Sequence, residues 1–375
     1  MEIYLDNNAC TPVDPRVIEA YAAAAVLAGN PQSQAHALGR AAADRITAGA
    51  HGVAQLVGCD PEEVCFVPGA TAALQMVLEA ERERRNGYRI LAGAADHPAI
   101  LDHLSRIGGL GQADVSFVPV DSVGRLQSEV FASMLGSARP HLVCLTAANN
   151  EVGTVERLEK MTELARAAGA VVLIDGSQAV GKLPISFSGL GCDHLVLSGA
   201  KLYSLPRTAA VVSQRALHDV AKARFGSPDA PAAVALGVAC RLRSEEMTSD
   251  ETRIATLRNR LQAELKMALP DMVINGDENC RIAGTLSFAV PDCPNDAVLD
   301  RLYGRLSLST GAACRSGAIA PSHVLVAMGV ANWVLDGVLR ASIGKFNTLA
   351  EIDLAAELIA GAITAVRNAR QRRIA

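Results

Sequence analysis

A lysine and an acid stand directly after two apolar runs of the chain. Lys201 closes Ser198-Gly199-Ala200-Lys201, which follows the run His194–Leu197. A lysine at such a place is usually a solvated charge, but a pocket that lowers its pKa lets it form a Schiff base with an aldehyde cofactor. Asp175 ends the run 171–174 and could keep a ring nitrogen protonated, so that the ring acts as an electron sink. The alternative for Asp175 is a helix N-cap.

Further polar groups occur at other ends of apolar runs. Gln178 and Asn150 could each donate to a ring oxygen, although both residue types are also common in turns. His97 could stack on a ring and move protons, but a lone histidine is more often structural. Gly69-Ala70-Thr71 joins a predicted strand to a predicted helix, where free N–H groups suit a phosphate. Together with Lys201, these groups supply the contacts that a phosphorylated aldehyde cofactor needs.

A reactive thiol is predicted in a stretch of small residues. Cys314 lies in Ser309–Gly317, between an apolar strand and a helix that begins near Pro321. We expect this thiol to be exposed and mobile, with Arg315 beside it to favour the thiolate. The chain has 9 cysteines and no CxxC pair, so we expect reduced thiols and no disulfide framework, and we predict no metal site.

Alternating strands and helices must position these groups. Apolar runs of strand length alternate with helical segments such as 70–85 and 161–168, which predicts a parallel sheet covered on both faces. Ligands of such folds bind at the carboxyl ends of the strands. The predicted strands of this part are 63–68, 89–94, 115–120, 141–147, 170–175 and 194–198, and residues 16–56 are predicted to be helical with a break at 29–31.

A smaller second domain is predicted from the change of pattern after residue 231. A helix to about 269 is followed by strands 282–290, 306–309 and 338–343, a helix near 323–328 and a C-terminal helix. The length of 375 residues also favours two domains. We place the large domain at 16–240 and the small α+β domain at 1–15 and 241–375.

The composition excludes some classes of function. The net charge of −4 gives no indication of a nucleic-acid surface. The N-terminus has no basic segment followed by an apolar run, and no apolar stretch is long enough to span a bilayer. We therefore expect a cytoplasmic location, with neither a membrane nor a nucleic acid as partner.

Taken together, these motifs resemble those of the NifS/IscS-like cysteine desulfurases, in the class V aminotransferase family. The resemblance runs nearly end to end. The similar segments are Tyr4–Ala9 (family YLDNNATTP), Gly29–His36 (GNPSSxH), Gly69–Thr71 (GAT), Asp96–Ala99 (EHxA), Asn149–Gly153 (NNExG), Asp175 with Gln178 (D-x-x-Q), and Cys314 followed by Pro321–Leu325 (ACxSG…PSHVL).

The resemblance implies an α/β enzyme of pyridoxal phosphate (PLP) fold type I, with a mostly parallel seven-stranded sheet in the large domain and a smaller α+β domain. It implies a homodimer that converts L-cysteine to L-alanine and leaves a persulfide on Cys314 for a sulfur-acceptor protein. Catalysis would involve Lys201, Cys314 and His97. The implied cofactor contacts are Ala70, Thr71, His97, Asn150, Asp175, Gln178, Ser198, Lys201 and Ser227, the last reaching the phosphate of the partner subunit.

The chain departs from the family pattern at several positions. Ala200 replaces the histidine that usually precedes the Schiff-base lysine, and Ser204–Arg207 replaces the Gly-Pro-Lys-Gly that follows it. Lys345 stands where the family's SxGRxT has an arginine, so Asn150 and Lys345 are the predicted substrate contacts. Lysine keeps the positive charge but, unlike arginine, cannot pair with a carboxylate through two parallel N–H groups.

These departures leave alternatives open. The chain could be a weakly active or partner-dependent relative, or a non-catalytic scaffold. Iron–sulfur cluster assembly, tRNA thiolation and DNA phosphorothioation all remain possible destinations of the sulfur.

Overall fold

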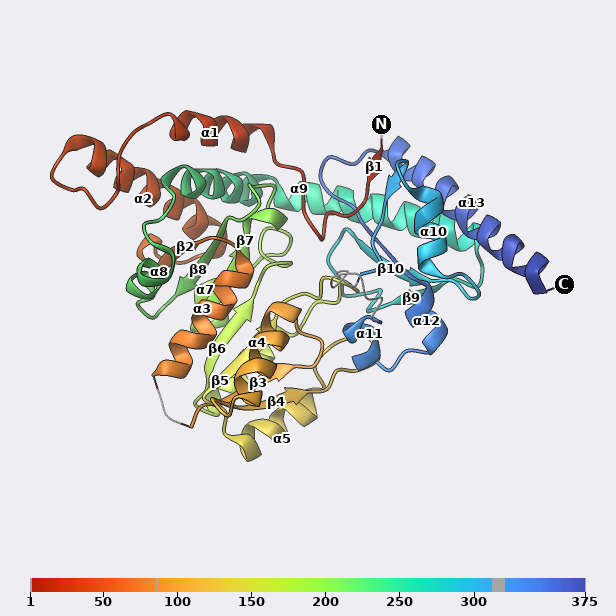
Figure 1. Ribbon diagram of the computed structural model, residues 1–375, viewed down its shortest axis with the longest axis horizontal. Helices are drawn as coiled ribbons and strands as arrows, with labels where there is room; N and C mark the ends of the chain where they lie inside the picture. Colours follow the sequence, from red (N-terminus) through yellow and green to blue (C-terminus); the bar gives the residue numbers. More distant parts are fainter. Residues whose placement is uncertain (1, 85–86, 312–320, 375) are drawn as a thin grey trace.

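The main sheet is built mostly of strands that are buried on both faces. The computed structural model describes residues 2–84, 87–311 and 321–374 (Figure 1). The sheet has seven strands in the order β2-β8-β7-β6-β5-β3-β4, and all neighbours are parallel except the two pairs that β8 makes. The strands are β2 (Val64–Val67), β3 (Arg89–Gly93), β4 (Asp114–Val118), β5 (Leu142–Thr146), β6 (Val171–Asp175), β7 (His194–Ser198) and β8 (Ala209–Ser213).

Successive residues of each strand pack against opposite layers of helices. In β6, Val172 and Ile174 belong to one apolar cluster, whereas Val171 and Leu173 belong to another, because side chains alternate across a sheet. The first layer contains α2 (Ala37–Val57), α5 (Ser128–Ala138), α6 (Leu158–Ala167), α7 (Phe187–Leu190) and part of α9 (Ala230–Ala268). The second contains α3 (Ala70–Glu83), α4 (Pro98–Gly109) and α8 (His218–Phe225). The predicted fold class is confirmed.

The second part of the chain forms a smaller α+β unit. A three-stranded antiparallel sheet has the order β12-β10-β9, and β1 pairs with β11 in a separate parallel ribbon. Its elements are β1 (Ile3–Tyr4), β9 (Val273–Asn275), β10 (Thr285–Ala289), α10 (Asn295–Leu302), β11 (Leu306–Ser307), α11 (His323–Ala327), α12 (Asn332–Gly337), β12 (Val338–Ser342) and α13 (Leu349–Ile374).

One long helix runs through both parts. Leu236 and Cys240 of α9 pack under the main sheet, whereas Ile254 and Leu261 join the apolar cluster of the second part, which also contains Leu5. The division of the chain near residue 240 stays a prediction.

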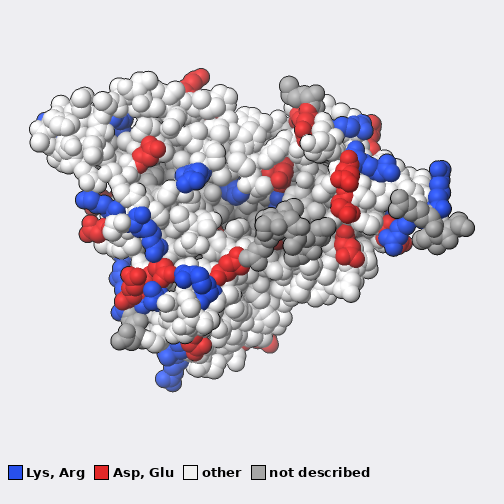
Figure 2. Space-filling view, in the orientation of Figure 1, with Lys and Arg blue, Asp and Glu red and all other residues white. Residues whose placement is uncertain are grey.

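Three strands differ from the sequence-based expectation. β1, β8 and β9 were not predicted, and β8 is the antiparallel strand of the main sheet. The break in the first helical region is confirmed, because α1 (Pro15–Ala25) and α2 flank residues 29–31. No helix within the described ranges is long and apolar enough to cross a membrane. Acidic and basic side chains are mixed on the face shown in Figure 2, and no continuous basic surface covers it.

Helices α2 and α9 lie side by side at a contact made of glycines (Figure 1). A Cβ added at Gly237 would lie 2.5 Å from Gly49 Cα, and a Cβ added at Gly52 would lie 2.2 Å from Gly237 O. These distances are far below van der Waals contact, so the backbones pack directly against each other and tolerate no side chain.

We predict that Gly237→Ala lowers the free energy of unfolding by roughly 1–3 kcal/mol, because the added methyl group forces α2 and α9 apart. Gly361→Ala is the matched control. Gly361 also lies inside a helix, α13, but nothing lies within 4 Å of a Cβ added there, so alanine should be neutral or stabilising by up to about 1 kcal/mol. Urea denaturation of both variants measures the difference, and equal effects would contradict the close packing.

Candidate active site

Lys201 and Asp175 are placed at the same edge of the main sheet. Strands β6 and β7 are parallel neighbours with Asp175 in register with Val196, and the buried Ser198 ends β7. Lys201 follows in the single 3-10 turn Gly199–Lys201, and its ammonium donates to the carbonyl of Ala9. Burial lowers the pKa of Lys201. A lower pKa favours the neutral amine, which is the form that attacks an aldehyde.

The carboxylate of Asp175 faces this edge from a buried position. Its side chain is 6% exposed, and Oδ1 accepts the N–H of Ser177 at 3.0 Å. One oxygen therefore makes the turn contact expected of a capping residue. Among the described residues no partner is found for Oδ2, so this oxygen is the one that could serve a ligand.

His97 caps the following helix and also lies within electrostatic range of the same groups. Its Nδ1 accepts the N–H of Ala99 at 3.1 Å at the start of α4. In the neutral ring Nε2 therefore carries the proton. Burial lowers the pKa of His97, and Asp175 and Lys201 are the next largest influences on it. The structural role and a role in the site are thus compatible.

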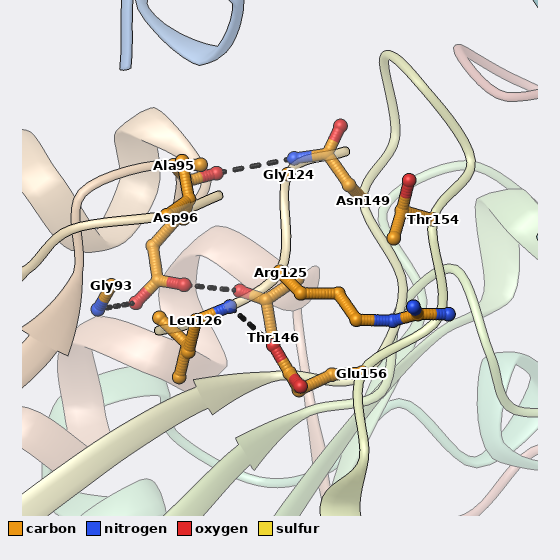
Figure 3. A pocket seen from close by; sticks show the side chains of 11 residues that line it. Gly93, Ala95, Asp96, Gly124, Arg125, Leu126, Thr146, Asn149, Thr154 and Glu156 are labelled. Atoms are coloured by element: carbon orange, nitrogen blue, oxygen red, sulfur yellow. Dashed lines mark hydrogen bonds between the residues drawn. The ribbon is translucent and has the colours of Figure 1, made fainter. Parts of the chain in front are cut away.

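Asp96, just before His97, ties the end of β3 to the end of β5. Its carboxylate accepts the N–H of Gly93 at 2.9 Å and the hydroxyl of Thr146 at 2.7 Å. Figure 3 shows these bonds beside a cavity of about 20 Å³, which has room for about one water molecule. Burial raises the pKa of Asp96 to about 7. This anchor fixes the backbone from which His97 projects.

Gln178 and Asn150 are joined through Asn8. The amide Nε2 of Gln178 donates to the carbonyl of Asn8 at 2.8 Å, and its Oε1 accepts from Lys182 Nζ at 2.8 Å. Asn8 Nδ2 in turn donates to the backbone carbonyl of Asn150 at 3.1 Å. Two predicted site residues are therefore held in one hydrogen-bonded group.

Arg340, in β12, is a residue that the sequence reasoning missed. It is 3% exposed, donates to Asp6 Oδ1 at 2.6 Å and to the carbonyl of Asn150 at 2.9 Å. Its buried Nε has no partner among the described residues, and its charge is one of those that lower the pKa of Lys201. The sequence did contain one signal for Arg340. It lies inside the predicted strand 338–343, and a buried arginine requires a charged or polar partner.

Lys345 is already engaged by protein groups. Its ammonium lies 2.5 Å from Asp14 Oδ2 and 3.4 Å from Glu246 Oε2, and its side chain is 5% exposed. It also lies over the ring of Tyr203, 4.8 Å from the centroid. These contacts give Lys345 a buried ion pair within the protein.

The remaining predicted residues lie at two other places. Ala70 and Thr71 open α3, where the first helical backbone bond runs from Ala73 N to Gly69 O, so the earlier N–H groups have no partner within the helix. Ser227 follows α8, accepts from Gln32 Nε2 at 2.6 Å and lines a groove of about 580 Å³.

Cys314 lies outside the described residues. The flanking segment is described: Ser322 donates to the buried Glu151 at 2.5 Å, and His323 Nε2 lies 2.9 Å from the carbonyl of Asp96. Ser322 and His323 therefore tie this described part of the chain to Glu151 and Asp96, which follow strands β5 and β3.

The chemistry of this donor set fits PLP. A half-buried lysine of lowered pKa suits the aldehyde, a buried carboxylate suits the pyridinium nitrogen, and the start of α3 suits the phosphate. Gln178 retains one amide hydrogen beyond its bond to Asn8, because an amide nitrogen carries two. A ring oxygen that accepts this hydrogen completes the match.

Comparison with known proteins agrees with this geometry. A profile of the aminotransferase class-V family matches residues 3–225 and 213–354. The chain is 32% identical to an IscS-like cysteine desulfurase of Mycobacterium tuberculosis, over 98% of this chain and 97% of the relative. It is 33% identical to a cysteine desulfurase of Nostoc sp., over 95% and 92%. A solved NifS-like protein superposes with a TM-score of 0.88 at 26% identity, over 97% of this chain and 100% of that one. The chain therefore belongs to the class-V aminotransferase family, among its NifS/IscS-like cysteine desulfurases.

Proposed function

We propose that this protein is a PLP-dependent cysteine desulfurase, which converts L-cysteine to L-alanine and passes the sulfur to Cys314 and then to an acceptor protein. The observation that carries the proposal is the meeting of Lys201, Asp175 and His97 at one edge of the sheet, within mutual electrostatic range. The family in general depends on PLP, which supplies an electron sink when bound.

The side chains have separate roles in this proposal. Lys201 would hold the cofactor aldehyde, and its free amine would take the α-proton of the substrate. Asp175 keeps the ring nitrogen protonated, and His97 moves protons through Nε2. Asn150, Gln178 and Ser198 line the ring, and the N–H groups of Ala70 and Thr71 hold the phosphate. The Cys314 thiolate attacks the substrate sulfur, so the carbon–sulfur bond breaks as the sulfur–sulfur bond forms.

Arg340 is the better candidate for the substrate carboxylate than Lys345. A guanidinium can pair with a carboxylate through two aligned N–H groups, and Arg340 has a buried Nε without a partner among the described residues. Each cation already has a carboxylate partner, Asp14 for Lys345 and Asp6 for Arg340, so the planar guanidinium is what favours Arg340.

We also propose a cytoplasmic homodimer in which Ser227 serves the cofactor phosphate of the partner subunit. The exposed position of Ser227, in a groove lined by apolar residues such as Phe66 and Phe225, supports this arrangement. The acceptor is expected to be a protein, as in iron–sulfur cluster assembly.

The first prediction concerns the attachment point. The purified protein should bind PLP and show a visible absorption band, because Lys201 forms a Schiff base with it. Reduction with borohydride and peptide mapping should place the pyridoxyl group on Lys201. Label on another lysine would contradict this assignment, and the absence of any bound PLP would contradict the proposed function.

A second prediction separates the two halves of the reaction. Cys314→Ala should still change the visible spectrum on addition of L-cysteine, because Lys201 and Asp175 remain. Persulfide on the protein, measured by mass spectrometry after alkylation, should disappear because the attacking thiolate is gone. Cys280→Ala, at an exposed cysteine of the second part, is the control and should behave as the parent. Parental sulfur transfer by Cys314→Ala would show that another group receives the sulfur.

A third prediction distinguishes Arg340 from Lys345. Arg340→Lys should raise the KM for L-cysteine by roughly ten- to a hundredfold, because one charged hydrogen bond is worth about 1.5–3 kcal/mol. Lys345→Met should leave KM unchanged but lower the free energy of unfolding by a similar amount, because it removes a buried partner of Asp14. A raised KM in Lys345→Met with an unchanged KM in Arg340→Lys would reverse the assignment.

A further inference from the structure

We infer that Lys182 is a positioning residue, whose ammonium holds the carboxamide of Gln178 in the one orientation that presents an N–H to the ring oxygen of the cofactor. The inference rests on the proposed function, because it assumes that Gln178 faces PLP. It concerns a second lysine of the site, distinct from Lys201.

The local chain geometry places Lys182 beside Gln178. The segment after β6 turns as a helix does, with Val180 N bonded to Gly176 O and Leu183 N bonded to Ala179 O. Across these turns Lys182 Nζ reaches Gln178 Oε1 at 2.8 Å. Gly181 keeps this turn tight, since its φ is +73° and a Cβ there would lie 2.3 Å from Leu202 Cδ2.

A carboxamide has two orientations of similar shape, and its neighbours must select one. Lys182 can only donate, so the atom of Gln178 that faces it has to be the oxygen. The Asn8 carbonyl can only accept, so the atom that faces it has to be the nitrogen. The two constraints agree, and the second hydrogen on Nε2 remains for the cofactor.

The same ammonium also orients Asn8. Lys182 Nζ lies 3.3 Å from Asn8 Oδ1, while Asn8 Nδ2 donates to Thr285 Oγ1 at 2.8 Å and to the carbonyl of Asn150 at 3.1 Å. One donor therefore fixes two amides, and through them the backbone on which Asn150 stands.

The surroundings give Lys182 a counter-charge. Burial lowers its pKa to about 7, and Glu251 of α9 opposes that shift, while Lys201, Arg340 and Arg243 reinforce it. Glu251 is itself held by Arg243, whose Nη2 donates to it at 3.0 Å. A half-buried lysine close to three other cations has a cost, and the orientation of the two amides is a function that would offset it.

The test compares cofactor binding in four single variants and one double variant by two readouts that do not depend on turnover. Lys182→Met removes the donor at nearly constant length, and Lys182→Arg restores a donor. Gln178→Leu removes the positioned amide. Lys160→Met, at an exposed lysine of α6, is the matched control. The readouts are the dissociation constant for PLP and the pH midpoint of the visible band of bound PLP.

Lys182→Met should weaken PLP binding by roughly tenfold. It should also move the pH midpoint upward, because a ring oxygen without its amide donor holds the nearby proton more tightly. Lys182→Arg should recover much of both effects, and Lys160→Met should match the wild type. In the Gln178→Leu background Lys182→Met should have little further effect, because coupled residues are not additive.

Unchanged affinity and midpoint in Lys182→Met, or effects that simply add to those of Gln178→Leu, would overturn the inference. If Lys182→Met does not fold, Lys182→Leu, which also has no donor, provides the same comparison. Failure of the wild type to bind PLP would overturn the proposed function as well, whereas normal binding by the wild type and by all Lys182 variants would overturn only this inference.

Discussion

Asn8 is the residue on which the assembly of the site depends, because each of its polar atoms has a partner. Its backbone N–H donates to Ser342 Oγ at 2.9 Å, and its carbonyl accepts from Gln178 at 2.8 Å. Its side-chain oxygen faces Lys182, and its side-chain nitrogen donates to Thr285. Asn8 is 4% exposed, and a buried polar atom without its partner costs about 1–3 kcal/mol. The strand ends of the main sheet and the small sheet must therefore both be in place before this residue is satisfied.

The main sheet could be predicted because strands buried on both faces appear as continuous apolar runs. The run Val171–Ile174 is one such case, and its residues pack alternately on the two layers of helices. β8 was missed because Ala209 and Ala210 have low β-propensity and its place between β2 and β7 is decided by pairing with strands far away in the chain. Pairing across such separations leaves no periodic signal in the strand itself.

The site could be predicted only where the topology alone brings residues together. Lys201 and Asp175 follow parallel neighbours, and the carboxyl ends of such strands meet at one edge. Asn8 and Arg340 were missed because their partners lie 142 and 334 positions away in the sequence, at Asn150 and Asp6. A single sequence contains no record of such contacts, and the motif comparison considered only Lys345, whose role toward a substrate stays a prediction.

The departures from the family pattern fall on groups that support the site. Ala200 lacks the usual imidazole, but its carbonyl accepts from Thr11 N at 2.9 Å and Thr11 Oγ1 at 3.2 Å, so the backbone that carries Lys201 is held without a side chain at this position. Lys345 retains a cation beside Asp14, whose pKa is lowered chiefly by its hydrogen bond to Arg16. A buried carboxylate of this kind needs a positive partner whether or not substrate is bound. Position 345 therefore needs a positive charge for structural reasons, and lysine supplies it. The planar guanidinium of Arg340 could pair with a carboxylate through two N–H groups.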